Sequence, residues 1–220
     1  MDAHFWHERW QRGEIGFHQE AVNTHLQNFW HRINAPPRAR VFVPLCGKSR
    51  DLLWLAGLGY EVVGVELSPI AVQAFFTENG LKPERLQIGA FEAWRQGEIQ
   101  ILHGDIFNLR RSDLATIDAV YDRASLVALP PPMRQRYAEH LASLLPEGCG
   151  VLLVTMEYPQ DQMNGPPFCV HEDEVRALFE TKFDVQVAHR EDILQANPRF
   201  RERGLTQMNE TVYLLRRNSA

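Results

Sequence analysis

The feature that most constrains the fold is a regular alternation of short, almost wholly apolar segments with longer segments of helical character. The apolar segments are too continuous for strands with one solvated face, so both of their faces are expected to be buried. Such strands are typical of a mostly parallel sheet that helices cover on both sides. The seven predicted strands are residues 40–45, 60–66, 98–103, 117–122, 150–156, 183–189 and 210–216.

The segments between these strands carry signals for the beginnings and ends of helices. Ser68 suits an N-cap and Pro69 the first position of a helix, whereas Gly59 suits a C-cap. The last two strands follow a loop rather than a long helix, which favours an antiparallel edge. We therefore predict an α/β, Rossmann-like, seven-stranded and mostly parallel sheet with helices on both faces. The predicted helices are residues 49–58, 68–79, 132–145 and 172–179.

The first 34 residues precede this alternation and have a different pattern. Apolar residues from Trp6 to Ile33 recur mostly at steps of three and four, which predicts helical pieces docked on another surface. The Pro36-Pro37 pair then ends the pattern and marks a boundary. The whole chain of 220 residues has the length of one domain with an appendage.

Composition excludes several functional classes. The 23 Lys and Arg residues are outnumbered by 28 Asp and Glu residues, whereas a nucleic-acid binder usually has a basic surface. No run approaches the roughly 20 apolar residues of a membrane helix. The N-terminus lacks the basic-then-apolar pattern of a signal peptide, so we predict a cytoplasmic protein.

Cysteine and histidine spacing gives no sign of a metal site. The cysteines at 46, 149 and 169 have no C-x-x-C spacing, which favours free thiols in a reducing compartment. Five histidines, His4 to His31, crowd the N-terminus, but their spacing matches no metal motif. We therefore interpret them as solvated or partly packed imidazoles and predict no metal.

Ligands of open α/β sheets bind outside the carboxyl ends of the strands, and the first such end is followed by Gly47-Lys48-Ser49. These residues resemble the end of a phosphate-binding P-loop. However, Phe42 stands where that loop needs its first glycine, which disfavours a nucleoside triphosphatase. The G-x-G-x-x-G fingerprint of dinucleotide sites is also absent, so Lys48 is interpreted as a solvated residue of the next helix.

The next two strand ends carry carboxylates. Glu66 lies about 20 residues beyond the glycine loop, where an acidic residue accepts hydrogen bonds from ribose hydroxyls in Rossmann-like sites. Alternatively, Glu66 only caps the helix that begins after Ser68. Asp105 and Ile106 follow the third strand and suit an adenine amino group and ring face, although Gly-Asp is also a common turn.

The fourth strand ends in Asp122-Arg123. An arginine at a strand end can hold a carboxylate in forked geometry, and the alternative is an internal ion pair with Asp122. Residues 164–168, Asn-Gly-Pro-Pro-Phe, are similar to the tetrapeptide of DNA amino-methyltransferases. However, a glycine interrupts the motif, and it follows the fifth strand rather than the fourth. No Pro-Cys nucleophile and no G-x-S-x-G elbow is present.

Several of these segments resemble one known family when taken in order along the chain. Together they are similar to thiopurine S-methyltransferases, which are class I S-adenosylmethionine-dependent enzymes, over about residues 5–215. The segments that carry the resemblance are WHERW at 6–10, GFHQE at 16–20, VPLCGK at 43–48, VVGVE at 62–66, DRASLVA at 122–128 and GPPF at 165–168.

The resemblance implies roles for individual residues. Arg123 is expected near both cofactor and substrate, where it anchors or polarises the substrate. Glu66 is expected to hold the ribose, and Asp105 and Ile106 to approach the adenine. The remaining residues expected in the S-adenosylmethionine pocket are Trp10, Leu45 and Gly47. Those expected to form the apolar walls of the substrate cavity are Phe17, Pro166, Pro167 and Phe168.

The resemblance also implies the reaction. Members of the family methylate aromatic and heterocyclic thiols such as thiopurines, and bacterial members are linked with selenium and tellurium compounds. A thiolate would attack the methyl group in line within a water-poor cavity, with no dedicated general base. We expect one domain over residues 1–220, with an α/β core at 39–216 and a helical lid at 1–38.

Other functions stay open at this point. The main alternative is a non-catalytic module that binds S-adenosylmethionine or a nucleoside as a sensor, although a sensor would not need an aromatic and proline wall. A nucleic-acid methyltransferase lacks both a basic surface and its motif peptides. We expect a monomer whose partner is a small aromatic thiol, with no nucleic-acid or membrane partner.

Overall fold

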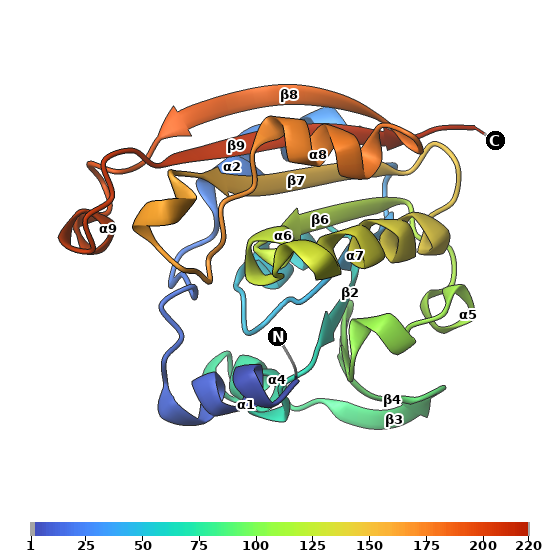
Figure 1. Cartoon of the computed structure of the whole chain (residues 1–220). Coiled ribbons are helices and arrows are strands. Elements are labelled where there is room, and N and C mark those ends of the chain that lie inside the picture. The colour runs from blue at the N-terminus through green and yellow to red at the C-terminus, as the bar shows by residue number, and fades with distance from the viewer. Residues whose placement is uncertain (1–2, 220) are drawn as a thin grey trace.

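The computed structural model describes residues 3–219, which form helices around one twisted sheet (Figure 1). The sheet has nine strands in the order β3-β4-β5-β2-β1-β6-β7-β9-β8. The strands are β1 (Arg40–Val43), β2 (Glu61–Glu66), β3 (Glu84–Ile88), β4 (Phe91–Gln96), β5 (Ile99–His103), β6 (Ala119–Arg123), β7 (Gly150–Glu157), β8 (Phe183–Asp192) and β9 (Asn209–Arg217).

The predicted α/β class and parallel centre are confirmed. Strands β5, β2, β1, β6 and β7 run parallel. The antiparallel edge expected from the last two strands is also present, because β9 pairs antiparallel with β7 and β8 antiparallel with β9.

The predicted count of seven strands is wrong, because β3 and β4 form an additional hairpin at the other edge. Four of the five residues of β3 are exposed, so this edge strand carries no apolar pattern that could be recognised. The hairpin closes between Ile88 and Phe91, and Gly89 adopts φ +55° in the turn. That left-handed conformation suits glycine, which has no Cβ to clash.

The four helices predicted between the strands are present with small shifts at their ends, whereas the short helices at Arg111–Leu114, Ser125–Ala128 and Pro198–Glu202 were not predicted. Ser68 is the N-cap of α4, and its hydroxyl accepts a hydrogen bond from the Ala71 amide, while Pro69 is the first helical residue. The α-helices are α1 (Ala3–Arg12), α2 (Thr24–Phe29), α3 (Asp51–Gly57), α4 (Pro69–Glu78), α5 (Arg111–Leu114), α6 (Ser125–Ala128), α7 (Pro131–Leu144), α8 (Glu172–Phe179) and α9 (Pro198–Glu202). The 3-10 helices are η1 (Trp30–Ile33), η2 (Ile106–Asn108) and η3 (Gln160–Gln162).

The two faces of the sheet bury separate apolar clusters. One contains side chains of α7 and α8, and the other contains side chains of α3 and α4. Leu26, Trp30 and Ile33 are buried in the second cluster, so α2 and η1 are part of the packed core. Only α1 and the loop after it remain as a cover at the edge of the molecule, with α1 beside α4 (Figure 1). Residues 1 and 2 of the predicted lid lie outside the described range.

The three cysteines are free and buried, as their spacing indicated. Among residues 3–219, none of the helices combines the length and the hydropathy needed to span a bilayer.

Candidate active site

A cavity of about 920 Å³ lies where the carboxyl ends of β1, β2, β5 and β6 meet α1 and the loop after it. This is the edge of the sheet at which open α/β folds bind their ligands, and its volume is within the range of small-molecule sites. The predicted site residues that line it are Trp10, Phe17, Leu45, Gly47, Glu66, Asp105, Ile106, Arg123, Pro166 and Pro167.

Phe168 is the predicted site residue that the structure places elsewhere. It is absent from the cavity lining formed by residues 3–219. A Cβ added at Gly165 would come within 2.5 Å of the Phe168 ring, and the Arg134 guanidinium lies over the ring at 5.9 Å from the centroid. The strand-to-helix loop therefore directs Pro166 and Pro167, rather than Phe168, toward the cavity.

The loop after β1 is shaped by two left-handed residues and by hydrogen bonds that its amides donate to β2. Leu45 adopts φ +47° and Gly47 φ +54°, which turns the backbone sharply under the cavity. The Cys46 amide donates to the Val65 carbonyl at 3.0 Å. A Cβ added at Gly47 would lie 3.5 Å from the Trp10 ring, so the indole rests directly on this loop.

Glu66 holds this loop and the next helix together. Its Oε2 accepts from the Gly47 amide at 2.8 Å, and its Oε1 accepts from the Ser68 amide at 2.7 Å. Burial raises the pKa of Glu66, and the hydrogen bonds from Ser68 and Gly47 oppose that rise. The carboxylate therefore orders the start of the α4 segment and also lines the cavity, while its predicted contact with a ribose stays a prediction.

The neighbouring polar residues are also held by local contacts. Asp105 is exposed and caps η2 by accepting from the Phe107 amide at 2.9 Å, while the Ile106 side chain is buried beneath it. Lys48 is not the solvated residue expected from the sequence. Its side chain is only 11% exposed, and its Nζ pairs with Glu78 of α4 at 2.8 Å.

The predicted alternative for Arg123, an ion pair with Asp122, does not occur. Successive residues of a strand point to opposite faces, so Asp122 lies in the core, where its Oδ2 accepts from the Tyr137 hydroxyl at 2.6 Å. Burial raises the pKa of Asp122 to about 6, and the Tyr137 hydrogen bond offsets part of that effect. Within residues 3–219 the half-buried Arg123 guanidinium has no ion-pair partner, and it lines the cavity.

Further arginines line the cavity that the sequence did not single out. Arg199 donates to the Gly16 carbonyl and thereby joins α9 to the loop after α1. Its pKa is lowered by burial and by the charges of Arg203 and Arg123, so these three guanidiniums lie near one another. No local motif marks Arg199 and Arg203, because only the chain's path brings α9 to the cavity. The other lining arginines are Arg9 and Arg136.

Aromatic rings cover the side of the cavity formed by the N-terminal segment. The Phe17 ring makes edge contacts with Trp6 and Trp10, at centroid distances of 5.8 and 5.7 Å. His18 follows in the same loop and also lines the cavity. Its pKa is lowered by burial and by the nearby Lys48 charge, so the imidazole is neutral at physiological pH.

Sequence comparisons identify the family to which these residues belong. A family model described as thiopurine S-methyltransferase matches residues 1–218. The chain is 47% identical to the thiopurine S-methyltransferase of Nitrosospira multiformis over 220 residues, which is 100% of both chains. It is 50% identical to that of Xanthomonas axonopodis pv. citri over 217 residues, or 99% of this chain and 100% of the relative.

The chain belongs to the thiopurine S-methyltransferase family. This confirms the resemblance found in the sequence motifs, and with it the expectation of a methyltransferase enzyme. One cavity is lined by residues of three segments that carried the resemblance, namely the tryptophan pair, the VPLCGK loop and Arg123 of the Asp-Arg pair. Asp122 of that pair is buried in the core.

Solved structures share the fold at low sequence identity. A methyltransferase from Anabaena variabilis that its description calls SAM-dependent matches with a TM-score of 0.67 at 12% identity, over 98% of this chain and 95% of that one. The 1,6-didemethyltoxoflavin-N1-methyltransferase of Burkholderia thailandensis, solved with 1,6-didemethyltoxoflavin and S-adenosylhomocysteine, matches with a TM-score of 0.65 at 15% identity. That match covers 99% of this chain and 87% of the other. The methyltransferase fold class predicted from the sequence is confirmed.

Proposed function

We propose that this enzyme transfers the methyl group of S-adenosylmethionine to the sulfur of an aromatic or heterocyclic thiol such as a thiopurine. One observation carries the proposal. A single cavity joins carboxylates at two strand ends, Glu66 and Asp105, to the guanidinium of Arg123, which has no ion-pair partner among residues 3–219. The volume of about 920 Å³ is sufficient for a nucleoside and a small aromatic acceptor together.

The carboxylate side of the cavity suits the methyl donor. Glu66 already accepts one backbone hydrogen bond on each oxygen, and a carboxylate has further lone pairs for ribose hydroxyls. Asp105 is exposed beside the buried Ile106, which suits the polar edge and the face of an adenine. Leu45, Gly47 and Trp10 would enclose the remainder of the molecule.

The arginine side suits an acceptor that carries negative charge. Arg123, Arg199 and Arg203 lie close enough for their charges to lower the pKa of Arg199. A thiolate or an acidic ring substituent would relieve this repulsion and form charge-assisted hydrogen bonds. Phe17, Pro166 and Pro167 supply apolar walls for an aromatic ring.

The chemistry requires positioning more than proton transfer. Bound S-adenosylmethionine supplies an electrophilic methyl group on a sulfonium. An acceptor thiolate would attack this methyl carbon in line as the sulfonium–methyl bond breaks and S-adenosylhomocysteine leaves. An anion and a cation would thus be neutralised together, which a cavity that excludes water favours. Arg123 anchors the acceptor so that its sulfur faces the methyl group. Aromatic thiols ionise readily, so no side chain has to remove a proton.

The N-terminal segment would exclude water from this reaction. Because α2 and η1 are buried in the core, we assign the role of lid to the described part of residues 1–22 rather than to the whole of 1–38. Trp6, Trp10 and Phe17 form its inner surface, and the bond from Arg199 to Gly16 holds its loop to α9. A covering segment of this kind can control access to a site.

The decisive experiment measures methyl transfer directly. Purified enzyme is incubated with S-adenosylmethionine and a panel of aromatic thiols, with selenium and tellurium compounds as separate arms, and methylated product is quantified by mass spectrometry. We expect product from aromatic thiols. Tight binding of S-adenosylmethionine without product from any arm would instead favour the sensor. A cytoplasmic location and a monomeric state stay predictions.

A further inference from the structure

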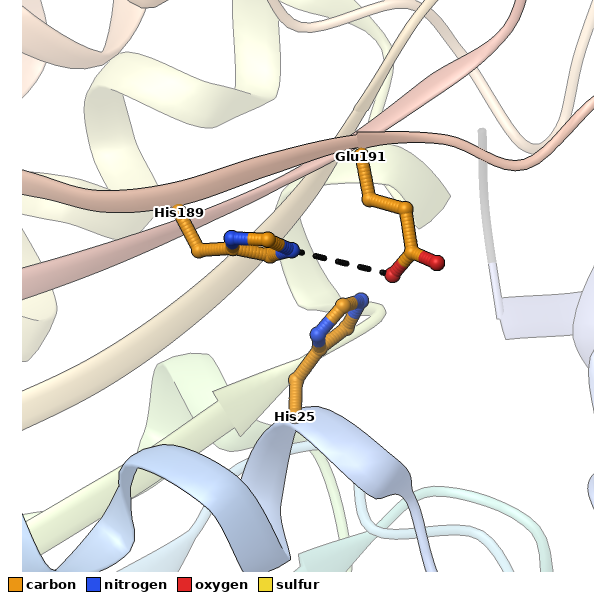
Figure 2. Close-up of side chains that lie close together, drawn as sticks. All are labelled: His25, His189 and Glu191. Carbon is orange, nitrogen blue, oxygen red and sulfur yellow. Dashed lines mark ion pairs between the residues drawn. The ribbon is translucent and has the colours of Figure 1, made fainter.

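Three side chains of types that can bind a metal, two of them from one strand and one from a distant helix, meet at the antiparallel edge of the sheet (Figure 2). His25 comes from α2, and His189 and Glu191 come from β8. One potential ligand atom from each residue lies within 4.8 Å of the other two. No spacing motif marks this cluster, because His25 is separated from the other two residues by most of the chain.

A bulge in β8 places two of these side chains on the correct face. Val187 pairs with Tyr213 of β9, but His189 pairs with the next residue, Val212, so the register shifts by one residue at this point. Without the shift, His189 and Glu191 would point to the opposite face, because strand side chains alternate. The bulge thus turns both toward α2. Bulges of this kind commonly re-aim side chains near functional sites.

The cluster also concentrates negative charge without a permanent cation. The shifted register sets Glu191 directly opposite Glu210 of β9, an arrangement in which like charges destabilise a sheet. His25 Nε2 lies 3.0 Å from Glu210 Oε2, and His189 Nε2 lies 3.7 Å from Glu191 Oε2. Within residues 3–219 neither carboxylate forms an ion pair with lysine or arginine. The adjacent Arg190 pairs with other carboxylates, those of Glu157 and Glu172.

The two imidazoles are held in place, whereas the carboxylate is free to adjust. The His25 side chain is 4% exposed. The His189 ring stacks on Phe29 of α2 at a centroid distance of 5.3 Å. The Glu191 side chain is 55% exposed. Ligands of a zinc ion stand about 2.0–2.2 Å from the metal, so their atoms must come closer than 4.8 Å, and Glu191 can rotate to achieve this.

We propose that His25, His189 and Glu191 bind a divalent transition-metal ion, with zinc as the expected occupant. Two imidazole nitrogens and a carboxylate oxygen form a ligand set that zinc commonly adopts. Glu210 lies beside the His25 ring and adds the negative charge that a dication requires. The ion would connect α2 to β8 and so fasten the N-terminal part of the chain to the C-terminal edge of the sheet.

The proposed metal site adjoins the active cavity and the anchor point of its covering loop. Glu210 also lines the cavity, so the proposed ion lies behind one of its walls. The chain continues from the covering loop directly into α2, so fixing α2 fixes the point at which the cover is anchored. The proposal does not depend on the identity of the methyl acceptor, and metal binding can be tested without measuring activity.

The test is a calorimetric titration of the full-length protein with ZnCl2, after treatment with EDTA and its removal. We expect saturable binding of one ion per chain and a higher Tm in the presence of zinc. Glu191→Gln should weaken the affinity at least roughly tenfold and abolish the rise in Tm. Because the Glu191 side chain is largely exposed, this variant should fold normally, which circular dichroism verifies.

A matched variant and a second metal make the test specific. His31→Ala removes an exposed histidine from the same segment and should leave zinc affinity unchanged. Titration with Co²⁺ should give visible d–d absorption bands that Glu191→Gln weakens. The proposal is overturned if the wild type shows no saturable zinc binding, or if Glu191→Gln and His189→Gln both bind zinc as tightly as the wild type. Either result would leave the cluster as two histidine–carboxylate pairs.

Discussion

The buried Asp122 carboxylate should make the stability of this enzyme fall as the pH rises through weakly acidic values. In the folded protein its pKa is raised by burial to about 6, against an ordinary value of 3.8. Between these two values the folded state holds a proton that the unfolded state has lost. The stabilisation from this group is therefore complete below 3.8 and is lost as the pH rises through about 6.

The size of the effect follows from the difference between the two pKa values. At about 1.4 kcal/mol per pKa unit, a rise from 3.8 to about 6 corresponds to about 3 kcal/mol of unfolding free energy. Asp122→Asn removes the titration while keeping the shape of the side chain and an oxygen that can accept from the Tyr137 hydroxyl. The variant should therefore lose this contribution to the pH dependence.

The assay is urea unfolding of wild type and Asp122→Asn between about pH 4 and about pH 7. The free energy of unfolding of the wild type minus that of the variant should decrease by about 2 kcal/mol across this range, since the full contribution is reached only below the ordinary pKa of 3.8. Other titrating groups cancel in the difference. Parallel stability curves, or a difference that increases with pH, would refute the assignment. Because Asp122 points away from the cavity, methyl transfer at neutral pH should be unchanged, whereas a large loss of turnover would contradict that placement.

Three further predictions concern the cavity and its supporting loop. Arg123→Ala should lower kcat/KM for an anionic aromatic thiol by roughly ten- to a hundredfold, because it removes a charged hydrogen-bond donor. Substitution of the exposed Arg111 by alanine is the control and should leave kcat/KM unchanged. Equal kinetics in the two variants would show that Arg123 does not act in the site. Gly64→Ala should destabilise the fold by about 1–3 kcal/mol in urea unfolding, because its Cβ would lie 2.6 Å from Cys46 Sγ, and adding Cys46→Ala should recover part of the loss. Trp10→Ala should weaken S-adenosylmethionine binding in calorimetry, since the indole rests on the loop after β1, and unchanged affinity in a folded variant would contradict a covering role.

Much of the fold could be predicted because it depends on local patterns. Continuous apolar runs indicate strands buried on both faces, and they located all five parallel strands of the sheet. The Ser68-Pro69 pair marked the start of α4 because capping is a property of a few adjacent residues. The hairpin of β3 and β4 was missed. Its edge strand β3 is exposed and needs no apolar side chains, so it has no apolar pattern to mark it.

The candidate site was only partly predictable. Residues at strand ends, such as Glu66 and Arg123, could be predicted because parallel strands bring their carboxyl ends to one edge. Arg199 and Arg203 could not be predicted, because they reach the cavity only through the path of the segment that connects β8 to β9 and contains α9. Phe168 was expected in the substrate wall from the resemblance of its motif, yet loop geometry turns its ring toward Arg134 instead.

By itself, the sequence determined the α/β class, the parallel centre of the sheet, the free thiols and the methyltransferase family, since each of these follows from local pattern or motif. Only the tertiary structure decided which side chains from distant parts of the chain lie next to one another. It separated Asp122 from Arg123, gathered three arginines at one cavity and set His25 beside His189 and Glu191. The physical reason is that contacts between distant segments depend on register, bulges and loop paths, and a one-residue shift in β8 is enough to reverse the face that a side chain presents.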